Sequence, residues 1–279
     1  MPCFTPKTVV QASTRRATAL GRTRTTGLVA TVLAVAVLSP VMATSTAADA
    51  AGEAYKVHSW TDQDGGTHLV RWNPCQTITY AVNVRMAGAS ESVRGAALKD
   101  VQRAFRRAAH RTGLTFSYSG RTTELPRNLG EQSWSDRQQA AEIVVAWVDQ
   151  SSRKFHSNLL SRVGSDYASG VGGWMLRGWQ DAKGRWQAAV GRGFVVINAG
   201  DNRSYEPGFG GGVTRGALLL HELGHALGLD HVGSTSELMY PTMLSRENSN
   251  YKAGDELGLA RVGERLGCIV GTSTWWPQI

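Results

Sequence analysis

Three histidines recur at short, fixed intervals in residues 221–231. His221 and His225 are four residues apart, so on a helix their imidazole rings lie on one face and can reach the same metal ion. Gly228 can adopt the positive φ that ends a helix, which lets the chain turn back and bring His231 in as a third ligand. Three protein ligands leave one tetrahedral position of a zinc ion open for water, which is the arrangement of a catalytic zinc site.

Glu222 follows the first of these histidines and lies beside the metal without having to bind it. A carboxylate in this position can act as a general base, which takes a proton from the zinc-activated water and passes it to a leaving amine. The sequence therefore predicts a zinc hydrolase that needs no serine or cysteine nucleophile. Histidines packed in a core without a metal are the alternative, but the apolar residues 217–220 before the motif favour a buried active-site helix.

A second motif, Glu-Leu-Met-Tyr-Pro, follows at residues 237–241. Together the two motifs resemble the metzincin clan of zinc endopeptidases, in which a tight turn places a methionine beneath the metal. The resemblance implies that Met239 is this methionine, and the spacing after His231 is most similar to the matrixin, or matrix metalloproteinase, family. It also implies that Tyr240 and Pro241 form a wall of the pocket for the side chain just after the scissile bond, and that Tyr240 does not coordinate the metal.

The resemblance implies an α/β (α+β) metzincin-like zincin fold. Such a fold has a twisted, mostly parallel sheet with an antiparallel edge strand, a long helix, an active-site helix, the Met-turn and a C-terminal helix. The patterns of apolar residues and of turn residues predict elements in the same order. These are a hairpin at 55–60 and 68–72, strands at 76–82, 114–118 and 142–148, a long helix at 92–112, an edge strand or hairpin and a central strand between 170 and 200, the active-site helix at 214–227 and a closing helix at 255–266.

The chain has 279 residues, of which 42% are hydrophobic and 19% are charged, which is ordinary for one globular domain. Residues 1–50 have the pattern of a signal peptide, with basic residues before an apolar stretch and a small-x-small cleavage site at 48–50. The apolar stretch is shorter than a bilayer span, although an uncleaved signal anchor stays open. We therefore expect one zinc metallopeptidase catalytic domain at residues 51–279, which is secreted, extracellular and monomeric.

The formal net charge of +8 falls to +4 without residues 1–50, because 25 basic and 21 acidic residues remain. This mild excess does not favour nucleic acid as a partner. We interpret Arg103, Arg106, Arg107 and Arg111 as the solvated face of the long helix. The expected partner is a protein or peptide substrate, and no stable membrane insertion is expected once the signal peptide has been removed.

Of the three cysteines, Cys3 lies in the predicted signal peptide, which leaves Cys75 and Cys268. An even pair in an oxidising compartment indicates a disulfide, with two free thiols as the alternative. Matrixins are typically held latent by a pro-segment cysteine at the fourth zinc position. No cysteine lies between the predicted cleavage site and Cys75. The resemblance is therefore to a secreted, bacterial-style form without a cysteine-switch prodomain.

Further metals and other functions have weaker support. The turn at residues 62–66 leaves a structural calcium ion open beside the simpler interpretation as a Gly-rich turn. Matrixins usually hold a second zinc on a His-x-Asp segment, which this chain lacks, since Ser157 and Asn158 follow His156. Two other functions stay open: a zinc hydrolase of cell-wall amide bonds and a non-catalytic, zinc-ordered binding protein. The presence of Glu222 argues against the second.

Overall fold

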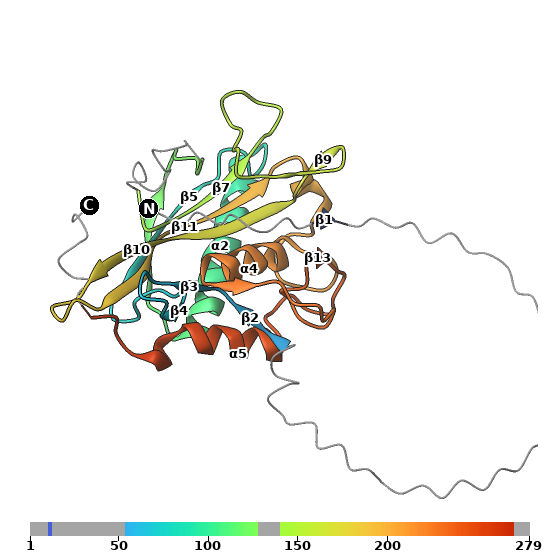
Figure 1. Ribbon diagram of the computed structural model, residues 1–279. Helices are drawn as coiled ribbons and strands as arrows, with labels where there is room; N and C mark the ends of the chain where they lie inside the picture. Colours follow the sequence, from blue (N-terminus) through green and yellow to red (C-terminus); the bar gives the residue numbers. More distant parts are fainter. Residues whose placement is uncertain (1–10, 13–53, 128–139, 271–279) are drawn as a thin grey trace, which may run out of the picture.

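A computed structural model describes residues 11–12, 54–127 and 140–270 (Figure 1). At its centre lies a five-stranded sheet with the strand order β10-β11-β7-β5-β6. Four of these strands are parallel, and β10 at one edge runs antiparallel to β11. The predicted fold class is therefore confirmed. The predicted signal peptide lies almost wholly outside the described residues.

The strands of the sheet and the helices follow in chain order. The strands are β5 (Ile78–Asn83), β6 (Phe116–Arg121), β7 (Ile143–Val148), β10 (Gly170–Gln180) and β11 (Trp186–Asn198). The helices are α2 (Glu91–Thr112), α4 (Arg215–Ala226) and α5 (Ala253–Val262), with the 3-10 helices η1 (Asp201–Ser204) and η2 (Glu264–Leu266). Within the described part of the chain, no helix combines the length and the apolar composition needed to cross a bilayer.

In the described ranges, eight short strands pair outside the sheet. They are β1 (Gln11–Ala12) with β13 (Thr242–Met243), β2 (Lys56–Val57) with β12 (Leu229–Asp230), β3 (Ser59–Thr61) with β4 (Thr67–Leu69), and β8 (Arg162–Val163) with β9 (Asp166–Tyr167). The predicted N-terminal hairpin is thus confirmed only for β3 and β4, because β2 pairs with β12 instead. Within this hairpin, the Asp62 carboxylate accepts hydrogen bonds from the backbone N–H groups of Asp64 and Gly66 and contacts His68.

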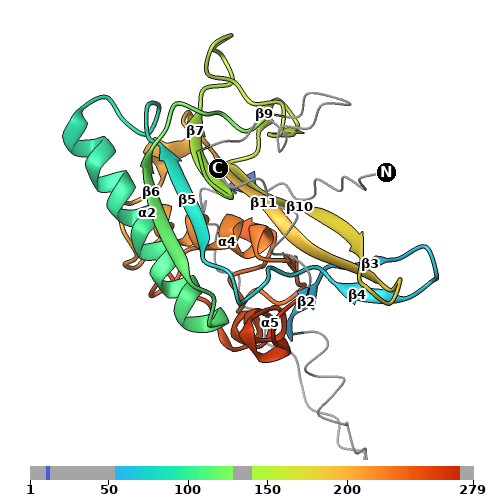
Figure 2. The ribbon, with the colours of Figure 1, turned by 90° about the vertical axis from the view of Figure 1, so that its left-hand side faces the viewer.

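Helices α2 and α4 cover one face of the sheet (Figure 2). Alternation along β11 separates two apolar clusters, since Val195 and Ile197 face these helices whereas Phe194 and Val196 face a smaller cluster on the opposite side. The central strand β7 is buried at every residue, as its continuous apolar sequence predicts. This two-sided burial holds the sheet rigidly behind α4.

Helix α2 has the predicted limits. The Ser90 side chain caps its N-terminus, and Gly113 ends it with a φ of 72°. The interpretation of its arginines as a solvated face is wrong for two of them. The Arg107 guanidinium lies 4.2 Å from the centroid of the Phe209 ring and donates to the Ser249 carbonyl, and Arg111 forms an ion pair with Glu256 at 2.8 Å. These contacts attach α2 to the loops around α4 and to α5.

The closing helix differs from its prediction in two respects. It starts at Ala253, and it breaks at Gly263 before resuming as η2, whereas the pattern predicts one helix to Leu266. Gly263 has an extended backbone at this break, and glycine is a weak helix former; a β-carbon there would lie 2.1 Å from the Thr112 carbonyl oxygen, so no larger residue fits. Leu266, which the pattern places on the buried face, is therefore 40% exposed.

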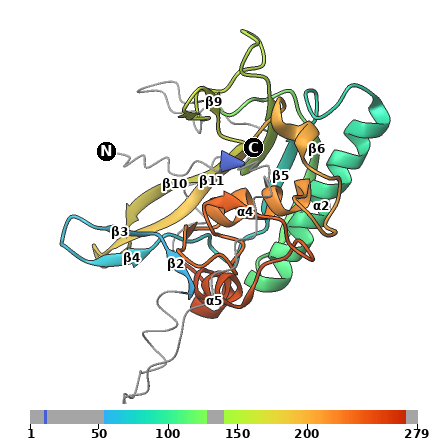
Figure 3. The same ribbon diagram turned by 90° about the vertical axis from the view of Figure 1, so that its right-hand side faces the viewer.

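The β10–β11 hairpin extends beyond the rest of the sheet. Its strands have 11 and 13 residues, whereas β7 beside it has six. Figures 2 and 3 show the β3–β4 hairpin alongside the far end of this extension, and side chains of both line one cavity. The Gly- and Trp-rich segment thus forms an edge strand that is hairpin-paired with β11, as the sequence predicts, and the structure shows in addition that it is long.

Candidate active site

Helix α4 carries the first two histidines of the motif. It begins at the predicted cap, where the Thr214 hydroxyl accepts a hydrogen bond from the Ala217 N–H at 3.0 Å. Every residue of α4 is buried, in agreement with the apolar sequence before the motif. The helix ends at Ala226, and Gly228 follows with a φ of +106°, which starts the predicted turn toward His231.

The three histidines converge at one point. The His221 Nε2 lies 3.2 Å from the His225 Nε2 and 3.1 Å from the His231 Nε2. Among the described residues, these three form the one group of at least three His, Cys, Asp or Glu side chains with a spacing suited to a metal ion. Sequence reasoning therefore chose three residues that the fold brings together.

Backbone carbonyls set the protonation of two of the rings. The Nδ1–H of His221 donates to the Leu238 carbonyl at 2.8 Å, and the Nδ1–H of His225 donates to the Leu229 carbonyl at 2.9 Å. In a neutral imidazole, each Nε2 then carries a lone pair that points at its neighbours. Such a cluster of lone pairs is repulsive unless a cation lies among them.

Burial keeps these rings neutral. Loss of solvation and the neighbouring histidines lower the pKa of His221 well below its usual value, and the pKa of His225 to about 3. Desolvation likewise lowers the pKa of His231 to about 4. Zinc bound tetrahedrally to imidazole would separate the nitrogens by roughly 3.3 Å, so the observed spacing fits this metal within a few tenths of an ångström. The donor set therefore fits zinc.

Glu222 is fully buried beside this cluster. Burial raises the pKa of its carboxyl group well above the usual value, and the nearby Gly172 N–H offsets this only partly. Neither carboxyl oxygen has a hydrogen bond of normal geometry. Burying a carboxyl group without hydrogen bonds is unfavourable unless water, a substrate or a metal-bound ligand hydrogen-bonds to it. The environment of Glu222 therefore indicates that such a ligand binds beside it.

Short strand pairing places the third histidine. β12 ends at Asp230, immediately before His231, and it pairs with β2 near the start of the described domain. The His231 backbone N–H donates to the Asp230 carboxylate at 2.7 Å. The position of His231 thus depends on a segment about 170 residues earlier in the chain, which the motif itself does not reveal.

The predicted Met-turn lies under α4. Met239 is buried, and a β-carbon at Gly224, between the first two histidines, would lie 2.6 Å from its sulfur. The Asp255 carboxylate on α5 accepts hydrogen bonds from the backbone N–H groups of Leu238 and Met239 at 2.7 and 3.1 Å. The turn therefore packs against the part of α4 between the two histidines, and hydrogen bonds from its backbone to Asp255 attach it to α5.

The other predicted residues have simpler surroundings. Tyr240 and Pro241 are partly buried and lead directly into β13. Cys75 and Cys268 form a disulfide with a Cα–Cα distance of 5.3 Å. His156 is partly buried, and its Nδ1 lies 2.9 Å from the Arg153 carbonyl oxygen.

Sequence reasoning missed several neighbours of the site. In the sequence His58 is one of four scattered histidines, yet its ring lies 4.0 Å from the Asp230 carboxylate and 5.5 Å from the centre of the Trp174 ring. Its charge when protonated also lowers the pKa of His225 and His231. Asp255 stands out in the sequence only as the start of a helix. Neither residue belongs to a spacing pattern, so only the tertiary fold could have identified them.

Comparison with known protein families gives a match that covers most of the described domain. The model of the family described as Matrixin matches residues 71–261, which is well over half of the chain and includes both motifs. No curated protein matches the chain.

Proposed function

We propose that this chain, which belongs to the matrixin family and is a zinc-dependent endopeptidase, is a secreted enzyme in which Glu222 is the general base. We also propose His221, His225 and His231 as the zinc ligands. The observation that carries the proposal is the convergence of three neutral imidazoles, with Nε2 atoms 3.1 and 3.2 Å apart, beside a buried carboxyl group whose oxygens accept no hydrogen bond of normal geometry from the described residues.

When bound, zinc would lower the pKa of water to near 7 and polarise the scissile carbonyl. Glu222 would accept the proton of the attacking water at a carboxylate oxygen and donate it to the nitrogen of the leaving amine. The carboxylate can serve both partners because no other hydrogen bond occupies its oxygens. The Leu238 and Leu229 carbonyls would keep two of the imidazole rings in the ligating orientation.

The substrate would bind along the edge strand β10. Among the described residues of the sheet this strand pairs only with β11, so the backbone groups on its other side can pair with an extended peptide. Glycines at 170 and 172 bring this edge close to Glu222, since a β-carbon at either position would lie less than 3 Å from atoms of that residue. Tyr240 and Pro241 would then form the wall of the pocket for the side chain after the scissile bond.

The proposed extracellular location rests on the chain itself. The Cys75–Cys268 disulfide is the kind of bond that persists in an oxidising compartment. The signal-like composition of residues 1–50 supports the same location. Mass measurement of the N-terminus of the protein recovered from culture medium tests it, since recovery only inside the cells, or with residues 1–50 attached, would contradict secretion with cleavage.

A substrate screen tests the proposed reaction. The purified protein is incubated with a quenched-fluorescent peptide library and, in parallel, with peptidoglycan, each with and without a zinc chelator and after zinc is restored. Cleavage of peptides that the chelator abolishes and zinc restores is expected. Release of fragments from peptidoglycan alone would favour the cell-wall amide hydrolase. Tight zinc binding with no cleavage of either would favour a binding protein.

A further inference from the structure

Trp72 lies between the end of the active-site helix and the sheet. Its side chain is only 3% exposed, and its indole N–H donates to the Ala226 carbonyl at 2.9 Å. A β-carbon at Gly193 on β11 would lie 3.1 Å from the Trp72 ring, so the ring packs closely on the sheet. Ala226 is the last residue of α4, where carbonyl groups lack partners within the helix. Trp72 therefore satisfies a buried carbonyl at the point where the chain leaves α4.

The segment after Ala226 must reverse direction to bring His231 back. The Gly228 carbonyl accepts a hydrogen bond from the His58 N–H at 2.8 Å, and a β-carbon at Gly228 would lie 2.5 Å from the Val70 carbonyl oxygen. This reversal is thus enclosed by the same N-terminal segment that contains Trp72. The indole N–H bonds to Ala226, the residue just before this reversal. A small change in the direction of the chain at Ala226 would therefore displace His231, which lies five residues later.

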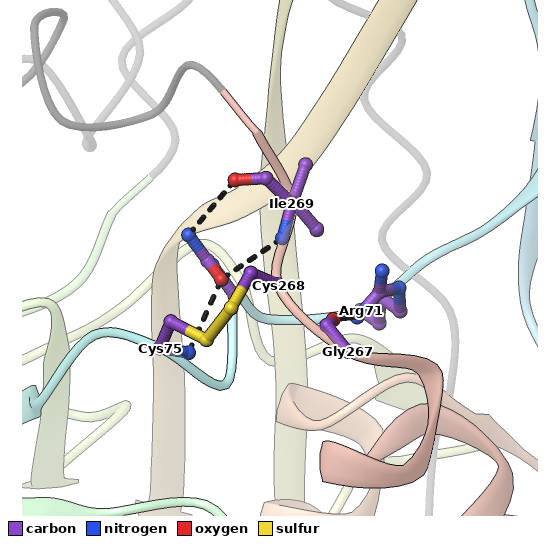
Figure 4. Close-up of a disulfide and its surroundings, with 6 residues drawn as sticks. Arg71, Cys75, Gly267, Cys268 and Ile269 are labelled. Carbon is purple, nitrogen blue, oxygen red and sulfur yellow. Dashed lines mark hydrogen bonds between the residues drawn. A yellow bond between two sulfur atoms is a disulfide. The ribbon is translucent and has the colours of Figure 1, made fainter.

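Residues on both sides of Trp72 in the sequence are bonded to the segment at 267–269; Figure 4 shows Arg71 and Cys75 beside Gly267, Cys268 and Ile269. The Asn73 side chain donates to the Ile269 carbonyl at 3.2 Å and accepts from the Ile269 N–H at 3.1 Å. The Arg71 guanidinium donates to the Gly267 carbonyl at 2.9 Å. The Cys75–Cys268 disulfide links the same two segments covalently. On the other side, the Arg71 carbonyl accepts a hydrogen bond from the Val190 N–H of β11 at 2.9 Å.

We propose that Trp72 is a positioning residue for the metal centre. Through the Ala226 carbonyl it sets the direction in which the chain leaves α4, and thereby the position of His231 relative to His221 and His225. The proposal rests on the proposed function, since it takes His231 as the third zinc ligand. It concerns the affinity and geometry of the metal site and not the cleavage step.

The Trp72→Phe variant tests it, because phenylalanine keeps an aromatic ring in place and removes the N–H donor. Zinc affinity is measured on the full, disulfide-bonded chain by competition with a chelator of known affinity. We expect zinc to bind about tenfold more weakly, which is the lower range for loss of an outer partner of a metal site. The visible absorption spectrum of the cobalt(II)-substituted variant should also change, since it reports ligand geometry. Wild-type zinc affinity together with a wild-type cobalt spectrum would overturn the proposal.

A second variant separates positioning from general destabilisation. Val196 is buried in the small apolar cluster on the opposite face of the sheet from α4, so Val196→Ala should lower the melting temperature and leave zinc affinity and the cobalt spectrum unchanged. Equal weakening of zinc binding in both variants would overturn the role of Trp72. If Trp72→Phe is obtained only unfolded, benzothienylalanine at position 72 provides the same test, because it has the shape of tryptophan without the N–H.

The readouts also separate this proposal from the proposed function. A wild-type protein that binds zinc but cleaves no peptide would contradict the peptidase reaction, while the zinc affinities and cobalt spectra of the variants would still decide the role of Trp72. A wild-type protein that binds no zinc would overturn both.

Discussion

Gly172 on the edge strand β10 lies directly against the backbone of Glu222 on α4. A β-carbon at Gly172 would come within 1.8 Å of the Glu222 carbonyl oxygen, a distance at which no side chain fits. Glycine at this position lets the strand that is proposed to bind substrate lie in contact with the helix that carries the proposed base. The spacing between substrate and Glu222 is therefore set by the lack of a side chain.

We predict that Gly172→Ala lowers kcat/KM about 100-fold. The added methyl group must push β10 away from α4, and a displacement of about 1 Å at a reacting centre has an effect of this size. Peptide hydrolysis and the melting temperature are measured together. Gly178→Ala on the same strand is the matched control, since its β-carbon would meet nothing nearer than 3.6 Å and should leave activity nearly unchanged. Equal activity of the two variants would contradict the steric account.

We predict that the Asp255 carboxyl group makes stability depend on pH. Burial, which outweighs its backbone N–H donors, raises its pKa from 3.8 to about 6. A carboxyl group with a raised pKa in the folded state favours folding when protonated, so its contribution is full below about pH 4 and is lost as the pH rises through 6. Relative to Asp255→Asn, the wild-type protein should lose about 3 kcal/mol of unfolding free energy across this range.

Denaturant unfolding of both proteins at pH 4 to 7, in the presence of a chelator, measures this difference. The subtraction removes the contributions of the other titrating groups, including the histidines, which are common to the two proteins. A difference that stays constant with pH, or that grows in favour of the wild-type protein as the pH rises, would show that Asp255 is ionised throughout.

We predict that removal of the disulfide lowers stability substantially. Cys75 and Cys268 are 193 residues apart in the chain, so the bond closes a very long loop. In the chain-entropy model such a loop contributes about 4–5 kcal/mol. The double variant Cys75→Ser/Cys268→Ser should lose this amount in denaturant unfolding, and the reduced wild-type protein should match it. A loss below about 1 kcal/mol would mean that the surrounding hydrogen bonds hold the two segments without the bond.

We predict that the buried ion pair between Asp100 and Arg215 holds the start of α4 against α2. The Arg215 Nε lies 2.9 Å from an Asp100 carboxylate oxygen, and both side chains are less than a tenth exposed. Asp100→Asn leaves the guanidinium buried without its counter-charge, which should cost about 3–5 kcal/mol. The double variant Asp100→Leu/Arg215→Met should be more stable than Asp100→Asn in the same unfolding measurement, and the reverse order would contradict a desolvated pair.

Much of the site could be predicted from sequence because its chemistry is local. His221, Glu222 and His225 lie within two turns of one helix, and the cap at Thr214 and the glycine at 228 mark where that helix ends. Their relative positions follow from helical periodicity, which any helix of this length imposes. For the same reason, the limits of α2 and the buried strand β7 agree closely with the pattern.

The remainder depends on contacts between distant segments. Trp72 and Asp255 act on α4 and the Met-turn through hydrogen bonds to backbone groups, which leave no periodic trace in the sequence. At the break at Gly263, the Thr112 carbonyl oxygen of another helix leaves no room for a side chain, and the glycine that fits there is a weak helix former. Packing of this kind overrides the local pattern, so a helix predicted to Leu266 ends at Val262 instead.

The proposed reaction requires three histidines to hold zinc while Glu222 transfers the proton. Its most direct test measures zinc content and peptide hydrolysis on the same preparations of the wild-type protein and Glu222→Gln. We predict one zinc ion per chain in both proteins and a loss of cleavage in the variant of about 100- to 10,000-fold, the usual contribution of a general base. A Glu222→Gln protein that retains zinc and cleaves peptides at the wild-type rate would show that Glu222 is not the general base.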